Sequence, residues 1–154
     1  DRLLRELPDL LSGYQHRLKD SKNIRLPLVV TRWQHPNFVI DAVAVYDLLL
    51  PALLSIMDHA VCSGQLLIGV EPGERSAGLV VRFPRQLLGY TPLGSILATA
   101  FRGYEAGNTG DHAGVITCEY GRLCYHLYDE DHYELALNCD PAGSTSETAK
   151  RAIP

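Results

Sequence analysis

No stretch of about 18 uncharged apolar residues occurs in the chain, so we expect no segment of it to span a membrane. Positive charge is also not in excess, because 14 Lys and Arg residues stand against 18 Asp and Glu residues. The basic residues are scattered, which argues against a nucleic-acid interface. No charged and then apolar leader precedes the first apolar stretch, and the first residue is Asp. We interpret the chain as a domain cut from a longer protein.

Cysteine is sparse, and no Cys-x-x-Cys pair occurs. The chain has four cysteines, too few at this length for a disulfide scaffold: Cys62, Cys118, Cys124 and Cys139. Two cysteines and two histidines in the last third of the chain are residue types that bind metal ions: Cys118, Cys124, His126 and His132. Their spacings match no zinc pattern. We therefore expect buried free thiols, no metal ion, and a reducing, cytoplasmic setting.

Apolar residues are plentiful enough for one core, at 46% of 154 residues. We predict one domain over residues 1–140 and a small, polar tail or linker over residues 141–154. The most informative stretch runs from Asp41 to Gly64, where apolar residues recur at three- and four-residue steps and predict a helix with one buried face. Asp41 is its expected N-cap, and Gly64 is its expected end. Pro51 predicts a kink or a helix start nearby.

The other expected elements follow from periodicity and turn residues. They are a helix over Leu3–Leu18 (continuous, or starting near Pro8), a polar turn over Lys19–Asn23, a strand over Ile24–Thr31, a hairpin of Gln65–Glu71 and Ala77–Phe83, a loop over Leu87–Gly94, a helix over Ser95–Tyr104 capped by Ser95, a mobile connection over Glu105–Gly114, and strands over Val115–Tyr120, Arg122–Tyr128 and His132–Cys139. This order predicts an α+β fold, a two-layer sandwich of a mixed β-sheet with helices on one face.

The order of elements resembles the ATP-binding domain of sensor histidine kinases, the GHKL fold shared with gyrase and Hsp90. The resemblance covers roughly residues 3–141. In that family an Asp introduces the long helix, as Asp41 does here, and the helix carries an Asn-Leu-Leu-x-Asn-Ala motif. The segment Ser55-Ile-Met-Asp-His-Ala60 lies on that motif without a gap. A hairpin, a glycine box, a lid, a helix and closing strands follow in the family, and the elements predicted above take the same order.

The residues that bind ATP in that family are replaced here. The second Asn of the motif, a Mg²⁺ ligand, is His59, and an imidazole nitrogen is a poor ligand for a cation that prefers oxygen. The Asp that reads adenine has no counterpart, because no Asp occurs between Asp58 and Asp111. The second glycine box keeps only one glycine. The resemblance implies a remnant ATP site, with the nucleotide lost, at Ser55, Asp58, His59 and Gly94.

Our first hypothesis is therefore a non-catalytic signalling module of two-component type, either histidine phosphotransferase-like or a pseudokinase domain, without a cofactor. By analogy it docks a response-regulator receiver domain or another signalling protein. The expected contact surface is on the first helix, at Tyr14, His16 and Arg17, and that helix also offers a route to a homodimer. The alternative is a divergent but functional kinase domain that binds ATP with Mg²⁺. A third reading is that the old pocket holds a different small ligand.

Several motifs have both a functional and a structural interpretation. The segment Gly107–Gly114 has the glycines of a phosphate loop, but it precedes a strand, so we expect a flexible connection. His59 is expected to be partly buried and hydrogen-bonded rather than a phosphoacceptor or a base. His16 is expected to be a solvated surface residue. The acids Asp129–Asp131 are expected to form a solvated hairpin tip rather than a cation site. Trp33 and His35 are either further contact residues or core residues, and the sequence does not separate the two.

Overall fold

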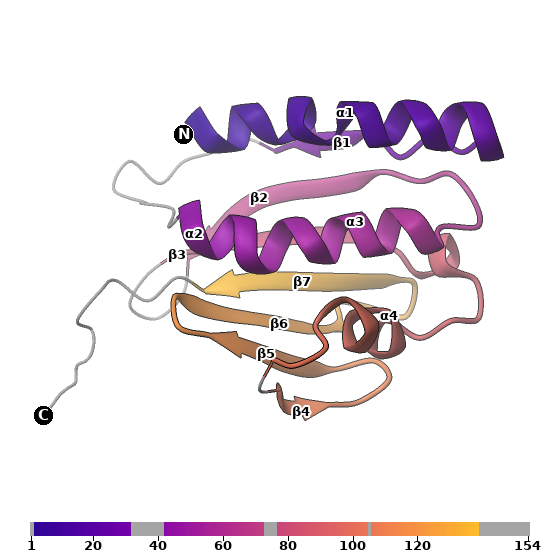
Figure 1. Ribbon diagram of the computed structural model, residues 1–154. Coiled ribbons are helices and arrows are strands. Elements are labelled where there is room, and N and C mark those ends of the chain that lie inside the picture. The colour runs from indigo at the N-terminus through magenta and orange to yellow at the C-terminus, as the bar shows by residue number, and fades with distance from the viewer. Residues whose placement is uncertain (1, 32–41, 73–76, 105, 139–154) are drawn as a thin grey trace, which may run out of the picture.

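The computed structural model describes residues 2–31, 42–72, 77–104 and 106–138 (Figure 1). The helices are α1 (Arg2–Lys22), α2 (Ala42–Ala44), α3 (Leu50–His59) and α4 (Leu93–Ala100), with a π-helical turn over Val45–Leu49 and a 3₁₀ turn over Arg85–Leu88. The strands are β1 (Leu28–Val30), β2 (Leu66–Pro72), β3 (Ala77–Pro84), β4 (Ala106–Thr109), β5 (Gly114–Cys118), β6 (Gly121–Leu127) and β7 (His132–Asn138). Predictions on Asp41, Trp33, His35, Cys139 and the 141–154 tail lie outside the described residues.

The predicted α+β sandwich is confirmed. Helices α1, α3 and α4 lie on one face of a mixed sheet with strand order β1-β2-β3-β7-β6-β5-β4 (Figure 1). Strand β1 runs parallel to β2, and the other neighbouring pairs are antiparallel. Because side chains alternate between the two faces of a strand, the pairing of Val81 with Leu135 and of Leu123 with Leu137 aligns apolar side chains in rows. These rows lie on the sheet face that the helices cover, and they form the sheet's part of the core.

The run from α2 through α3 is the central helix of the core. Seven of its side chains are completely buried: Ala44, Leu48, Leu49, Ala52, Leu53, Ile56 and Met57. By length and composition alone, residues 42–59 are also apolar enough to cross a membrane, with a mean hydropathy of 1.4, a property that buried core helices share. In this fold the buried side of the run packs with the sheet residues in one apolar cluster.

A π-helical turn explains how this run accommodates Pro51. The N–H of Leu50 bonds the carbonyl of Val45, five residues back, and α3 begins there with Pro51 in its first turn, where a missing N–H costs little. Of the two outcomes predicted at Pro51, a kink or a helix start, the structure shows a change from π-helix to α-helix at Leu50 within one helical run over residues 42–59. The predicted end at Gly64 is wrong, because Ala60 is already extended and the Gly64 N–H donates to the carbonyl of Arg25 at 3.1 Å.

Helix α1 is one continuous helix through Pro8, and it runs four residues past the predicted end. It stops where Asn23 adopts a left-handed φ of 56° and its N–H bonds the carbonyl of Lys19 at 3.0 Å. The predicted polar turn over Lys19–Asn23 is therefore helical except at its last residue. The predicted strand over Ile24–Thr31 is shortened to β1, because only Leu28–Val30 pairs with β2.

Two boundaries in the second half also differ from prediction. Helix α4 begins at Leu93, with Pro92 at its N-cap, so Ser95 lies inside the first turn and is not the cap. The segment predicted as a mobile connection contains β4, which pairs with β5 through a bulge between Ala106 and Asn108. Glycine and asparagine carry little strand signal, so backbone pairing rather than side-chain pattern defines this strand.

Candidate functional site

Ser55 and His59 lie one turn apart in α3, and both are bonded within the domain. The half-buried Ser55 donates its hydroxyl to the carbonyl of Ile96 in α4 at 3.4 Å. The Ser55 carbonyl in turn lies 2.9 Å from Nδ1 of His59, and since a carbonyl can only accept, that nitrogen carries the proton. His59 is hydrogen-bonded, as predicted, but it is exposed rather than partly buried.

Asp58 lies beside His59 at the exposed end of α3. Its carbonyl accepts a hydrogen bond from Nζ of Lys22 at 3.0 Å, which ties the end of α1 to the end of α3.

Nowhere in residues 2–31, 42–72, 77–104 and 106–138 do three His, Cys, Asp or Glu side chains gather closely enough to hold a metal ion. The described cysteines Cys62, Cys118 and Cys124 are free thiols, but they are half-buried rather than buried as predicted. Cys118 packs against the core cluster, whereas Cys124 lies on the opposite face of the sheet.

The first N–H groups of α4 are all taken by groups of this chain. The Leu93 N–H donates to the hydroxyl of Tyr133 at 3.3 Å, and the Gly94 N–H donates to the carbonyl of Asp111 at 2.8 Å. The Ser95 N–H bonds the carbonyl of Pro92 at 3.1 Å. Such N–H groups are the donors with which a helix start binds an anion. At this helix start they are already satisfied.

Gly94 is in close contact with the turn that joins β4 to β5. A Cβ placed on Gly94 would overlap the carbonyl oxygen of Gly110 and lie 3.1 Å from Cα of Asp111. The hydroxyl of Tyr125 donates to the same Gly110 carbonyl at 2.8 Å, so this turn is held between α4 and β6. The segment that resembles a phosphate loop thus directs carbonyl oxygens, rather than N–H donors, at the start of α4.

Tyr133 and Tyr125 complete this contact from the sheet. The Tyr133 hydroxyl accepts from Leu93 and lies 2.6 Å from Nδ1 of His112, to which it can donate its own proton. Burial raises the pKa of Tyr125 above its ordinary value, and the charges of Asp111 and Tyr133 add to the effect, so the phenol remains a donor near neutral pH. Sequence reasoning missed these three side chains, because their partners lie 15 to 40 residues away in the chain.

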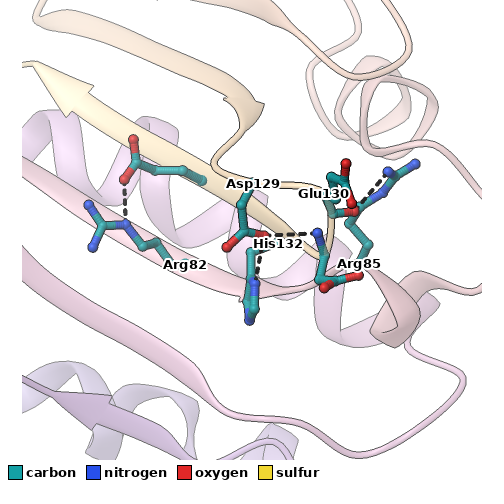
Figure 2. Close-up of polar contacts among 7 residues, drawn as sticks. Arg82, Arg85, Asp129, Glu130 and His132 are labelled. Atoms are coloured by element: carbon teal, nitrogen blue, oxygen red, sulfur yellow. Dashed lines mark hydrogen bonds and ion pairs between the residues drawn. The ribbon is translucent and has the colours of Figure 1, made fainter.

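A second polar cluster lies at the turn between β6 and β7 (Figure 2). The carboxylate of Asp129 accepts from the ring of His132 at 2.9 Å and from the N–H of Asp131 at 2.8 Å. The guanidinium of Arg85 donates to the carbonyl of Glu130 at 3.1 Å, which joins the turn to the 3₁₀ segment. The three acids are exposed, as predicted, and they also order the turn.

The hydrogen bond from His132, with a smaller contribution from the N–H of Asp131, lowers the pKa of Asp129 below its ordinary value of 3.8. A lowered carboxyl pKa adds stability above the ordinary pKa, and this stability is lost as the pH falls through the folded-state value. We expect His132→Ala to move the Asp129 titration back toward 3.8, measured by NMR of the carboxyl carbon. An unchanged titration in that variant would contradict the assignment, and Asp129→Asn should remove the signal altogether.

The sheet face opposite the helices carries an ion-paired carboxylate. Glu134 of β7 is only 7% exposed, and its two oxygens contact Nε of Arg82 at 2.6 Å and Nε2 of His126 at 2.9 Å. The Arg82 guanidinium also lies 3.9 Å from the ring centroid of Tyr128, a cation–π contact (Figure 2 shows Arg82). Because Glu134 pairs with Arg82 on β3 and with His126 on β6, the cluster holds three strands in register.

The predicted partner-binding residues lie on α1. His16 and Arg17 are exposed, as predicted for His16. Tyr14 lies on the same helix, and its side chain is outside the described part of the structure. Whether these residues contact a partner remains a prediction.

No protein-family model and no curated protein matches this chain. Among solved structures, the chain is similar to the histidine kinase AdeS of Acinetobacter baumannii, with 13% sequence identity and a TM-score of 0.41. The similarity covers 90% of this chain and 66% of that chain, so this chain spans just under two thirds of the length of the chain it matches. This likeness is distant, and the fold class rests on the strand order and helix layer described above.

Proposed function

We propose that this domain is a non-catalytic docking module of a two-component-type signalling protein, and that it has lost nucleotide binding. The observation that carries the proposal is the occupied start of α4, where the family's second glycine box would cradle phosphate. A nucleotide there would have to displace the turn at Gly110 and Asp111 and break its bonds to Gly94 and Tyr125. Each such bond contributes about 1 kcal/mol.

The remnant magnesium position supports the same proposal. Mg²⁺ takes oxygen ligands in near-ideal octahedral geometry. At the motif positions on α3, the hydroxyl of Ser55 is directed to Ile96, and His59 offers ring nitrogens in place of an amide oxygen. The working-kinase alternative would need both groups to rearrange before a metal ion could bind.

Without nucleotide binding, we propose that the domain works in the cytoplasm by docking a partner protein. The exposed side chains of His16 and Arg17 on α1 provide a polar surface away from the occupied helix start. The proposed partner is a response-regulator receiver domain. The second proposed partner is another copy of this chain, bound through α1. Against a panel of receiver domains we expect at least one binder, with Arg17→Glu weakening it by about tenfold, equal to about 1.4 kcal/mol. The matched Arg122→Glu change on β6 should have no effect.

The first experiment is titration of the purified domain with Mg-ATP and Mg-ADP, followed by calorimetry and thermal unfolding. We expect no binding heat and no stabilisation. A nucleotide present at a hundredfold above its dissociation constant would add about 2.7 kcal/mol of stability, which is easily measured. Clear binding that is weakened by His59→Ala would overturn the proposal and establish the working ATP-binding domain instead.

A further inference from the structure

We propose that a pocket between α1 and the segment that follows it binds a small organic phosphate monoester. The pocket has a volume of about 300 Å³, at the small end of ligand-binding sites. Among its lining residues are Gln15, His16 and Lys19 of α1 and Arg25, Leu26 and Pro27 of the following segment. The proposal goes beyond the docking function and does not depend on it.

The walls of the pocket are fixed by the backbone. The left-handed residue Asn23 ends α1 and turns the chain back along the helix. The side-chain amide of Gln15 donates to the carbonyl of Leu26 on the returning segment. On the other side, the N–H of Arg25 donates to Oγ of Ser63 at 2.8 Å, and its carbonyl accepts from the N–H of Gly64 at 3.1 Å. The pocket is therefore held in shape without a ligand, which lowers the entropy lost on binding.

The pocket surface is mostly apolar, and two of the residues that line it are cationic. Lys19 and Arg25 are basic, the ring of His16 adds a further donor, and no acidic residue lines the pocket. Asp20 follows His16 by one helical turn but is not part of the lining. No carboxylate in the described part of the chain forms an ion pair with Lys19 or Arg25. A phosphate monoester, with a charge of about −1.5 to −2 near pH 7, matches these two cations.

The remaining lining selects for an organic group on that phosphate. The exposed Pro27 adds apolar surface beside the cations, whereas Leu26, only 2% exposed, lines the pocket from within the core cluster. A ligand whose phosphate meets Lys19 and Arg25 can bury a small apolar group against this surface, and inorganic phosphate cannot. The site lies at the β1 end of the helix layer, away from α4 at its other end (Figure 1). It shares no lining residue with the remnant ATP positions, although the bond from Lys22 to Asp58 brings the end of α1 next to the end of α3.

The test uses phenyl phosphate as the probe, with binding followed by NMR of the backbone amides and by calorimetry. We expect saturable binding, with shifts confined to residues 12–27 and neighbouring Ser63 and Gly64. Inorganic phosphate should bind about tenfold more weakly, and added salt should weaken both. The Lys19→Gln and Arg25→Gln changes should each weaken phenyl phosphate about tenfold, because each removes a charge-assisted contact. The control Arg102→Gln removes an exposed cation beyond the end of α4 and should change nothing.

Three results would overturn the proposal. One is the absence of saturable binding up to about 10 mM probe, since even a millimolar ligand would be seen there. Another is an equal affinity for inorganic phosphate and phenyl phosphate, which would mean that the organic group contributes nothing to binding. The third is a set of shifts on α3 and α4 instead of α1, which would place the ligand in the old ATP position. That last result would also count against the docking proposal, whereas failure of the α1 pocket alone would leave the docking proposal intact.

Discussion

Replacing Gly94 with alanine is expected to destabilise the domain by about 3 kcal/mol, the upper part of the range for adding a methyl group to a packed site. The new Cβ would overlap the carbonyl oxygen of Gly110, which is backbone and cannot rotate aside as a side chain can. Moving that turn would also break the bond from the Gly94 N–H to Asp111 and the bond from Tyr125 to Gly110, both 2.8 Å long. Urea unfolding of both proteins gives the difference.

Gly13 provides the matched control, because it too is a glycine inside a helix. A Cβ placed there meets no atom within 4 Å. Gly13→Ala is therefore expected to stabilise the domain by about 0.5–1 kcal/mol, the ordinary gain from removing a helical glycine. If Gly94→Ala gave the same gain, the close contact between α4 and the β4–β5 turn would be absent. The support for an occupied helix start would then be lost.

Side-chain pattern was sufficient to predict the sheet where it is strong. The hairpin was expected over 65–71 and 77–83, and the structure has β2 at Leu66–Pro72 and β3 at Ala77–Pro84. Leu66 and Ile68 in β2 are buried at alternate positions, as are Leu79, Val81 and Phe83 in β3, which is the period expected of a strand with one inward face. The same reasoning located β6 and β7 within one residue at each end.

Prediction failed where backbone contacts rather than side chains decide the structure. Strand β4 is formed by residues 106–109, Ala-Gly-Asn-Thr, and no period marks it. The end of α1 depends on Asn23, whose left-handed conformation is compatible with a turn or with a helix C-terminus. In both places the local sequence permits more than one structure, and hydrogen bonds to neighbouring segments select one of them.

The candidate site shows the same division. The motif positions Ser55 and His59 lie in α3 as the resemblance implied, and the bond from Ser55 to Ile96 brings α3 against α4, which contains Gly94. What fills the start of α4 was not predictable. Tyr133 is 40 residues from Leu93 in the chain, and nothing in the local sequence around either residue indicates their contact.

Leu53→Ala is expected to destabilise the domain by about 3–4 kcal/mol, within the range for buried leucines. Leu53 lies in the middle of α3, is completely buried, and packs in the cluster between the helices and the sheet. Truncation removes apolar contacts and leaves a cavity that the surrounding side chains fill only in part. Chemical unfolding followed by circular dichroism measures the loss.

Leu10→Ala is the matched control, because it makes the same Leu-to-Ala change at a residue of α1 that is 45% exposed. It is expected to cost less than about 1 kcal/mol, because less apolar area is withdrawn from water at that position. The comparison also decides the role of residues 42–59, which are apolar enough to cross a membrane. If residues 42–59 form a core helix, Leu53→Ala must lower the free energy of unfolding of the domain much more than Leu10→Ala does. Equal, small effects at both sites would mean that the 42–59 helix does not pack on the sheet in the folded domain.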